Sequence, residues 1–292
     1  MLVVFNFADD KFKQQQEDNS QTALFIGKAD KVYCYHPEDI DPKFIRERSE
    51  IFSYSRGHGL WIWKAYFALK TLSLLNDGDY LMYCDAGSYF VNDIHYLMDT
   101  MKKESVDFMP FELPLVEHQW TKREVYDYMK IDSLGKNQIL ASYFILKKSK
   151  ETVEFIQEWL NYMSNPICLL PKRLTNIPNP IDFIAHREDQ SVFSILCHMH
   201  NFKTFRDPSQ FGDWPWLYKM DYATYNPKKY YNSSYPRILI SNRRIPMRKF
   251  AKVIYKKDLL NKLGLLRLEW EIKHFVKIII YGKLSKAEAN KQ

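Results

Sequence analysis

RGHGLWIWKAYFALKTLSLLNDGDYLMYCDAGSYFVN, residues Arg56 to Asn92, carries the clearest structural pattern in this chain. After two glycines, apolar residues recur at helical spacing from Trp61 to Leu75, which predicts a helix. The turn-forming residues Asn76-Asp77-Gly78 end that helix. The apolar run Tyr80–Cys84 follows, and its length and flanks predict a buried strand.

The predicted strand ends on Asp85, which the small residues Ala86 and Gly87 follow. A carboxylate at the carboxyl end of a buried strand lies at the edge where open α/β sheets bind ligands. Small residues after it let a ligand approach the backbone closely. We therefore interpret these three residues as part of a binding site. The alternative is an ordinary aspartate in the turn that ends a strand.

Strands and helices alternate along the first half of the chain. The runs Leu2–Phe7 and Lys31–Tyr35 predict two further strands, and Pro42–Ile51 predicts a helix with proline in its first turn. Strands are also expected at Val106–Phe111 and Tyr143–Leu146. This alternation predicts an α/β fold of the Rossmann-like kind, with a mostly parallel mixed sheet and flanking helices.

The composition limits the class of protein without deciding it. The chain has 292 residues, enough for one large α/β domain or a domain with an appendage. Its aromatic content of 16% suits either sugar-stacking surfaces or an aromatic core, and its net charge of +7 suits several anionic partners. The four cysteines show no zinc spacing, and no segment has the pattern of a signal peptide or a membrane-spanning helix. We therefore expect a cytoplasmic protein.

The strand-end motif resembles a known family. Tyr83-Cys84-Asp85-Ala86-Gly87, followed by Val91-Asn92-Asp93-Ile94 and Leu97, resembles the segment of GT-A-fold glycosyltransferases whose Asp-X-Asp motif holds a divalent metal against the diphosphate of a nucleotide sugar. The run from Arg56 to Gly87 is similar to bacterial and viral surface-polysaccharide glycosyltransferases with a "GxGxWxWK…NDGD…YxDAG" signature.

The resemblance implies a nucleotide-sugar donor, a glycan acceptor, and Mn²⁺ or Mg²⁺ with Asp85 as its protein ligand. Gly87 stands where the second Asp of the motif would be. Because such metals usually take several oxygen ligands, a single carboxylate is a poor metal site. We therefore expect weaker metal binding than in an enzyme with the full motif.

The same resemblance places the donor nucleotide at the loop after the first strand. Asn6, Phe7 and Ala8 are then candidates to hold the base and the ribose. Arg56 and Lys64 are candidates to neutralise the diphosphate, Arg as a planar fork and Lys as a point charge. The alternatives are an ordinary polar loop and a solvated helix face.

Further residues match the family in the middle of the chain. Trp120 and Arg123 open a predicted helix and are expected to line the acceptor or phosphate side. Gln138, Ala141 and Ser142 lead into a strand, and the resemblance places them under the donor sugar.

The segment His186-Arg187-Glu188-Asp189-Gln190-Ser191 opens another predicted helix. It resembles the "HRxDQS" element of the same family and, more loosely, the Asp-Gln element of glycogenin-like retaining transferases. We expect His186 and Arg187 to contact the substrate, and Asp189 and Gln190 to act on the donor sugar, because carboxylates stabilise oxocarbenium-like charge. The alternative for Asp189 is a plain helix N-cap, with Gln190 exposed.

The C-terminal part is basic. Arg243 and Arg244 belong to a cluster that we expect to fold over the diphosphate. Apolar residues at helical spacing between Lys256 and Tyr281, with lysines around them, suit a membrane-surface helix, a dimer contact or packing on the same domain. We expect a catalytic domain over residues 1–250 and a basic amphipathic helical tail over residues 251–292.

The expected function is the transfer of a sugar from a nucleotide diphosphate sugar, a UDP-sugar in the first place, to a glycan of a surface polysaccharide or glycoprotein. Asp189, Gln190 and Asp85 are the expected catalytic residues, and the Asp-Gln element favours a retaining outcome. One alternative is a sugar-phosphate nucleotidyltransferase, although the loop Asn6–Asp10 lacks the glycine-rich sequence of that class. Another is a non-enzymatic carbohydrate-binding module. A nucleic-acid partner is not expected, because it would leave the strand-end carboxylates without a role.

Overall fold

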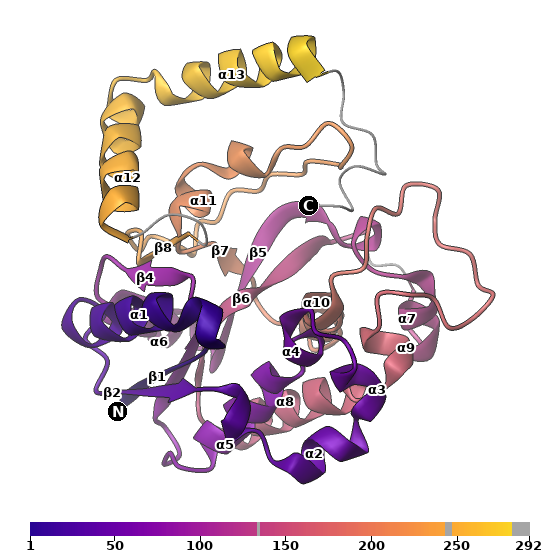
Figure 1. The fold of residues 1–292 in the computed structure, drawn as a ribbon. Coiled ribbons are helices and arrows are strands. Elements are labelled where there is room, and N and C mark those ends of the chain that lie inside the picture. Colours follow the sequence, from indigo (N-terminus) through magenta and orange to yellow (C-terminus); the bar gives the residue numbers. More distant parts are fainter. Residues whose placement is uncertain (133–134, 243–246, 282–292) are drawn as a thin grey trace.

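Three short apolar runs form the centre of the computed structural model, which describes residues 1–132, 135–242 and 247–281 (Figure 1). Strand β1 lies between β2 and β3 and pairs in parallel with both. Their observed bounds confirm the predicted ones. The strands are β1 (Leu2–Phe7), β2 (Lys31–Tyr35), β3 (Tyr80–Cys84), β4 (Ser88–Phe90), β5 (Phe108–Val116), β6 (Asn137–Lys147), β7 (Phe205–Arg206) and β8 (Leu239–Ser241).

In the described part of the chain, six strands form one sheet in the order β2-β1-β3-β6-β5-β7. β6 is antiparallel to both of its neighbours, and the other pairings are parallel. All strands of this sheet except β6 therefore point the same way, and their carboxyl ends meet at one edge. β4 and β8 form a separate antiparallel pair.

Helices cover both faces of this sheet. The helices in the described part of the chain are α1 (Lys13–Phe25), α2 (Pro42–Glu47), α3 (Ser49–Phe52), α4 (Gly57–Leu60), α5 (Trp63–Leu72), α6 (His95–Glu104), α7 (Arg123–Tyr128), α8 (Lys150–Met163), α9 (Pro166–Leu169), α10 (Glu188–Met199), α11 (Gln210–Asp213), α12 (Met247–Lys262) and α13 (Leu266–Tyr281). Short 3-10 turns lie at Asp10–Phe12, Pro37–Asp39, Glu117–Gln119 and Pro215–Tyr218.

The strand pattern explains the layers. Side chains alternate along β1, so Val3 and Phe5 pack with α5, α8 and α10, while Leu2 and Val4 pack with α1 and α6. The apolar runs read as continuous because both faces of the central strands are buried. The expected α/β fold, with a mostly parallel mixed sheet and flanking helices, is confirmed.

Several predicted boundaries are wrong. The helix predicted over Pro42–Ile51 is divided at Arg48 into α2 and α3. The strand expected at Val106–Phe111 begins and ends later, as β5, and the strand expected at Tyr143–Leu146 is only the second half of β6. Burial of the whole of β5 and nearly all of β6 explains their greater length, because apolar partners are available on both sides.

The helix predicted after Arg56 is also wrong at its beginning. Gly57 to Trp61 all have positive φ, between +51° and +82°. The backbone N–H groups of Leu60 and Trp61 donate to the carbonyl oxygens four residues earlier, at 3.0 and 3.1 Å. Residues 57–61 therefore form one left-handed turn, a conformation that costs an L-residue roughly 1–2 kcal/mol. The right-handed helix begins only at Trp63.

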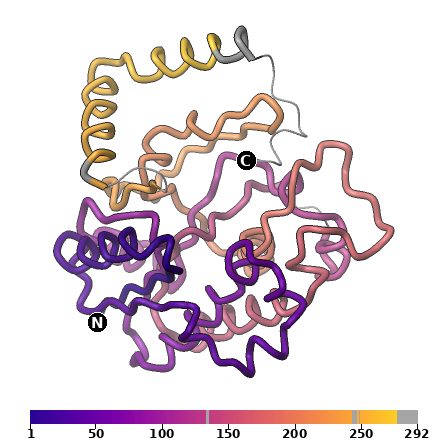
Figure 2. The backbone as a smooth tube through the Cα atoms, viewed as in Figure 1, coloured from indigo at the N-terminus to yellow at the C-terminus, as the bar shows by residue number. Residues whose placement is uncertain are grey.

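The two C-terminal helices extend away from the sheet (Figures 1 and 2). Ile254 of α12 packs with Trp214 and Ile240, and Leu266 of α13 is buried in the same cluster. Within the described residues, no helix is both long enough and apolar enough to span a bilayer. The division into a domain ending at residue 250 and a tail stays a prediction, although α12 begins before that boundary.

Candidate active site

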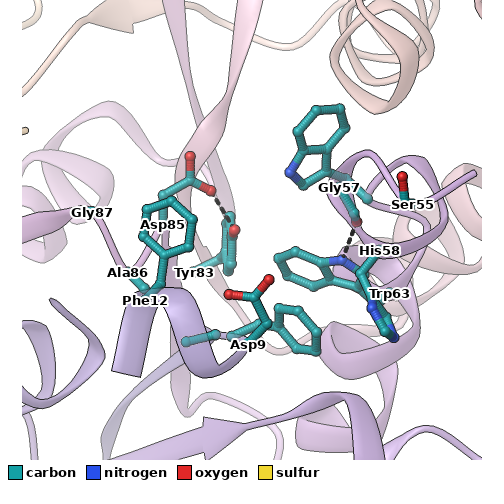
Figure 3. A pocket seen from close by; sticks show the side chains of 13 residues that line it. Asp9, Phe12, Ser55, Gly57, His58, Trp63, Tyr83, Asp85, Ala86 and Gly87 are labelled. Atoms are coloured by element: carbon teal, nitrogen blue, oxygen red, sulfur yellow. Dashed lines mark hydrogen bonds between the residues drawn. The ribbon is translucent and has the colours of Figure 1, made fainter. Parts of the chain in front are cut away.

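A pocket opens at the carboxyl edge of the sheet, beside the ends of β1 and β3 (Figure 3). Three segments line it: the loop after β1, the left-handed turn with the start of α5, and the turn after β3. Phe7, Ala8, Asp85, Ala86 and Gly87 all lie in this lining, as their shared sheet edge suggests. The lining also contains residues that were not predicted as ligand contacts, namely Asp9, Phe12, Ser55, His58, Trp61, Trp63 and Tyr83.

The left-handed turn forms one wall of the pocket. The Trp63 Nε1–H donates to the Gly57 carbonyl oxygen at 2.8 Å, and the Trp63 ring stacks on Phe7 with 3.9 Å between ring centroids. A Cβ added to Gly57 would lie 2.4 Å from a ring carbon of Trp61. Glycine is thus required here both by its positive φ and by the ring above it.

Lys64 connects the two acidic segments of the site. Its Nζ lies 2.8 Å from Asp189 Oδ2 and 3.5 Å from Asp85 Oδ1, and it donates to the Ala141 carbonyl oxygen at 3.1 Å. The Lys64 side chain is only 5% exposed. One buried ammonium therefore joins α5, the end of β3, β6 and the first turn of α10.

Asp85 is held by contacts on two sides. Its backbone N–H donates to the Ser142 carbonyl oxygen at 2.8 Å, and the Tyr83 hydroxyl donates to Oδ1. Burial, together with the negative charge of Asp85, raises the pKa of Tyr83 well above its ordinary value. Tyr83 therefore remains a protonated donor to the carboxylate.

Asp189 does not cap its helix. The N-cap residue of α10 is Arg187, and the Asp189 side chain points to Lys64 from the first turn. The N-cap alternative is therefore wrong. Burial raises the pKa of the Asp189 carboxyl, and the nearby Lys64 ammonium opposes that rise.

Gln190 belongs to a polar network rather than to an exposed helix face. Its Oε1 accepts from the Ala141 backbone N–H at 3.2 Å, and its Nε2 donates to Gln138 Oε1 at 2.9 Å. Arg187 donates to the same Gln138 oxygen at 2.8 Å and lies over the Trp120 ring, 3.7 Å from the centroid. Five residues named from the sequence thus meet beside Lys64.

Other residues named from the sequence lie elsewhere. Asn6 is fully buried and donates to Asn19 and Ser20 of α1, so it holds the β1–α1 packing and does not line the pocket. Arg123 pairs with Asp127 of its own helix at 2.9 Å. Ser142 contributes its backbone carbonyl to Asp85.

His186 and Arg56 also have protein partners. The His186 Nε2 lies 2.8 Å from the Cys168 carbonyl oxygen, and burial lowers the pKa of His186 to about 3, so the ring is neutral. Arg56 is 65% exposed and lies 3.3 Å from Glu188 at the rim of the site. Arg243 and Arg244 lie outside the described residues.

Two buried carboxyl groups escaped the sequence analysis. Glu117 accepts from the Ser194 hydroxyl at 2.5 Å and from the Thr121 hydroxyl, and burial raises its pKa to about 7. Burial also raises the pKa of Glu188 to about 7, against the opposing charge of Arg56, and Glu188 has a φ of +39°. Glu117 belongs to no motif, so no sequence signal marked it; Glu188 stood at the variable position of the "HRxDQS" element.

The residues present do not fit a divalent-metal site. Among the described residues, no three His, Cys, Asp or Glu side chains gather closely enough to hold a metal. Gly87 supplies no side-chain ligand, and the two carboxylates that do meet are bridged by an ammonium. Mn²⁺ and Mg²⁺ need several oxygen ligands, which this donor set does not provide.

Comparisons with known proteins give distant likenesses only. No protein-family model and no curated protein matches the chain. The solved structures with similar folds include mouse xyloside xylosyltransferase 1 in its apo form, at 8% identity over 84% of this chain and 100% of that chain, with a TM-score of 0.46. A glycosyltransferase involved in the glycosylation of the major capsid of PBCV-1 matches at 9% identity over 55% of this chain and 65% of that chain, with a TM-score of 0.31.

Proposed function

We propose that this chain is a GT-A-type glycosyltransferase that moves a sugar from a nucleotide diphosphate sugar to a glycan acceptor of a surface polysaccharide or glycoprotein. The donor that we favour is a UDP-sugar. The observation that carries the proposal is the meeting of Asp85 and Asp189 on the Lys64 ammonium. Two acidic motifs far apart in the sequence thus come together at the edge where open α/β sheets bind ligands.

The pocket suits a nucleotide diphosphate. Phe12 and Trp61 present ring surfaces on which a base can stack, and the loop after β1 supplies the polar side of the pocket through Asp9. Ala86 and Gly87 leave the backbone after β3 open to a diphosphate. In this arrangement the donor lies between the left-handed turn and the end of β3.

The donor sugar then lies over Asp189. A carboxylate below the anomeric carbon stabilises the positive charge that develops there during glycosyl transfer. Because Asp189 is bound to an ammonium at 2.8 Å, it suits charge stabilisation better than removal of a proton from the acceptor. We therefore assign a retaining outcome, with Gln190 and Gln138 beside the sugar and Trp120 and Arg187 toward the acceptor.

We also propose that the C-terminal helices contact an anionic membrane surface. On α13, Leu268, Ile272 and Phe275 are each more than half exposed, on the side opposite the inward-facing residues Leu266 and Trp270. The segment 247–281 contains nine Lys and Arg residues against three Asp and Glu residues. An apolar stripe within a basic segment is the pattern of a helix that lies in the membrane interface.

A nucleotide-sugar panel tests the catalytic proposal. Each donor is measured for its shift of the melting temperature, because a ligand that binds only the native state stabilises it. The release of nucleotide diphosphate is measured in parallel, on the wild type and on Asp85→Asn. A donor that binds and is hydrolysed by the wild type alone supports the proposal. Release of pyrophosphate from a nucleoside triphosphate would assign a nucleotidyltransferase instead, and binding of free glycans without any nucleotide would assign a carbohydrate-binding module.

A further inference from the structure

The Lys64 ammonium already occupies the space between the two carboxylates of the site. Its contacts to Asp189, Asp85 and the Ala141 carbonyl, at 2.8, 3.5 and 3.1 Å, involve three oxygen atoms from three separate segments. The contact to the Ala141 carbonyl oxygen is a hydrogen bond, and the contacts to the two carboxylates are ion pairs. A divalent ion that bridged the same two carboxylates would have to take this position.

Lys64 cannot easily leave that position. Its side chain is 5% exposed, and its Nζ lies 5.3 Å from the Tyr83 ring centroid. The carboxylates it joins are 7% exposed for Asp189 and 15% exposed for Asp85. Removing the ammonium would take the ion-pair partner of Asp189 out of a buried site, which is strongly unfavourable.

We infer that Lys64 supplies the site's positive charge as a fixed side chain, and that a nucleotide diphosphate binds here without a divalent metal. The diphosphate half of the inference rests on the proposed function. The metal half rests on the described side chains alone. It also accounts for Gly87, because a site whose cation is a lysine has no use for a second metal-binding aspartate at that position.

A further cation, Arg56, lies at the rim of the site. Arg56 lies at the mouth, next to Gly57 of the pocket wall, and its side chain is 65% exposed. Burial raises the pKa of its partner Glu188 to about 7. Near neutral pH, Glu188 is therefore ionised in only a fraction of the molecules, and the remaining fraction has no ion pair between Glu188 and Arg56. Arg56 can therefore turn its planar fork to the phosphates.

The metal half is tested with Mn²⁺ alone, by the loss of the free-ion signal in electron paramagnetic resonance. The wild type should show no saturable binding up to roughly millimolar Mn²⁺, the weak end of the range for oxygen-ligand sites. Lys64→Met keeps the apolar stem and removes the charge, so it should bind Mn²⁺ more tightly than the wild type, because the ammonium no longer repels the ion. Lys70→Met, on the exposed side of the same helix, is the matched control and should behave as the wild type.

The diphosphate half is tested by calorimetric titration of UDP in EDTA and in Mn²⁺. Wild-type affinity should agree within about threefold between the two conditions. Lys64→Met should lose about tenfold or more in EDTA, because a unit charge beside the diphosphate is gone, and should regain affinity in Mn²⁺. A melting scan shows whether the variant is folded, and the wild-type measurements decide the inference if it is not.

Two results would overturn the inference. One is saturable binding of Mn²⁺ to the wild type that Asp85→Asn abolishes. The other is wild-type UDP binding that requires Mn²⁺. If UDP and the other nucleotides bind under no condition, the proposed function and the diphosphate half fail together, and the Mn²⁺ titration still decides the metal half.

Discussion

Asp189 Oδ2 and Lys64 Nζ lie 2.8 Å apart, and both side chains are almost completely buried. Such a pair is costly to break, because removing one partner leaves an uncompensated buried charge. The pair joins the first turn of α10 to α5 and fixes the Asp189 carboxylate within the site.

Asp189→Asn tests the role of this carboxylate, because it keeps the shape and removes the charge. We expect turnover to fall by roughly 100- to 1,000-fold, the effect of losing one preorganised electrostatic contact to a transition state. Nucleotide affinity should change little, since the β1 loop and the turn after β3 hold the nucleotide. Kinetics of donor hydrolysis, separated into kcat and KM, measure both quantities.

The control for Asp189→Asn is Asp127→Asn, which breaks an exposed pair on α7 and should leave turnover unchanged. Near-normal turnover of Asp189→Asn with an unchanged melting temperature would mean that Asp189 only positions Lys64.

Gly57→Ala tests the left-handed turn. The new Cβ would meet the Trp61 ring at 2.4 Å while the backbone holds a φ of +59°. We expect the free energy of unfolding to fall by about 2 kcal/mol or more, measured by urea denaturation.

Gly78→Ala is a matched control for that measurement. Gly78 also has a positive φ, of +89°, but no heavy atom lies within 4 Å of its added Cβ. The free energy of unfolding of Gly78→Ala should fall by about 1 kcal/mol, from the backbone conformation alone. Equal losses at the two positions would show that the pocket wall yields to the new methyl group.

Glu117→Gln tests the buried carboxyl beneath the Gln138 network. The folded-state pKa of Glu117 is raised to about 7 from an ordinary value of 4.5. Its contribution to stability is therefore fully present below pH 4.5 and is lost as the pH rises through about 7, because the folded state then has to bury an ionised group.

Between pH 5 and pH 8, the wild type should consequently lose on the order of 2 kcal/mol of unfolding free energy relative to Glu117→Gln. Urea denaturation of both proteins at the two pH values measures the difference. Parallel pH profiles would mean that the Ser194 and Thr121 hydroxyls hold Glu117 ionised at both values. Glu124→Gln provides a contrast, since hydrogen bonds and the charge of Lys122 lower the pKa of Glu124.

The exposed stripe of α13 is tested in the full chain with the double variant Ile272→Gln and Phe275→Gln. We expect the wild type to sediment with vesicles of anionic lipid, more weakly at high salt, and the variant to remain in solution. Leu74→Gln, which removes an equally exposed apolar side chain after α5, should bind as the wild type. If the wild type sediments with no vesicles, the stripe does not bind membranes and makes another contact. A dimer of the wild type that the double variant disrupts would assign the stripe to a contact between two copies of the chain.

The sequence predicted the centre of the fold well because β1, β2 and β3 are short runs with turns at their ends. Position at a strand end was also enough to place Asp85 at the ligand edge. The prediction from helical periodicity was wrong after Arg56, because the spacing of apolar residues does not depend on the sign of φ. The glycines at positions 57 and 59 were the available sign of a backbone with positive φ. Glu117 could not be found, since its burial depends on Thr121 and Ser194, which only the tertiary fold brings to it.

The ion pairs of Lys64 could not be predicted from the sequence either. Its sequence context suggested a cation for the diphosphate, but nothing in a one-dimensional pattern indicates that two carboxylates from other segments surround it. The Asp-Gln motif likewise suggested a site and left the N-cap alternative open, which the position of Arg187 at the helix start decides.

The reversed direction of β6 gives the two halves of the site separate supports. Because β6 runs against its neighbours, its first residues lie beside the ends of the parallel strands, and Asp85 bonds to Ser142. Its amino-terminal half and the end of β5 extend beyond β3 as a ribbon, with Val116 opposite Asn137. Residues 117–132, which follow β5, reach the site from this ribbon, whereas the loops after β1 and β3 reach it from the parallel strands. On the proposed function, the acceptor side of the site therefore rests on the ribbon, and the donor side rests on the parallel strands.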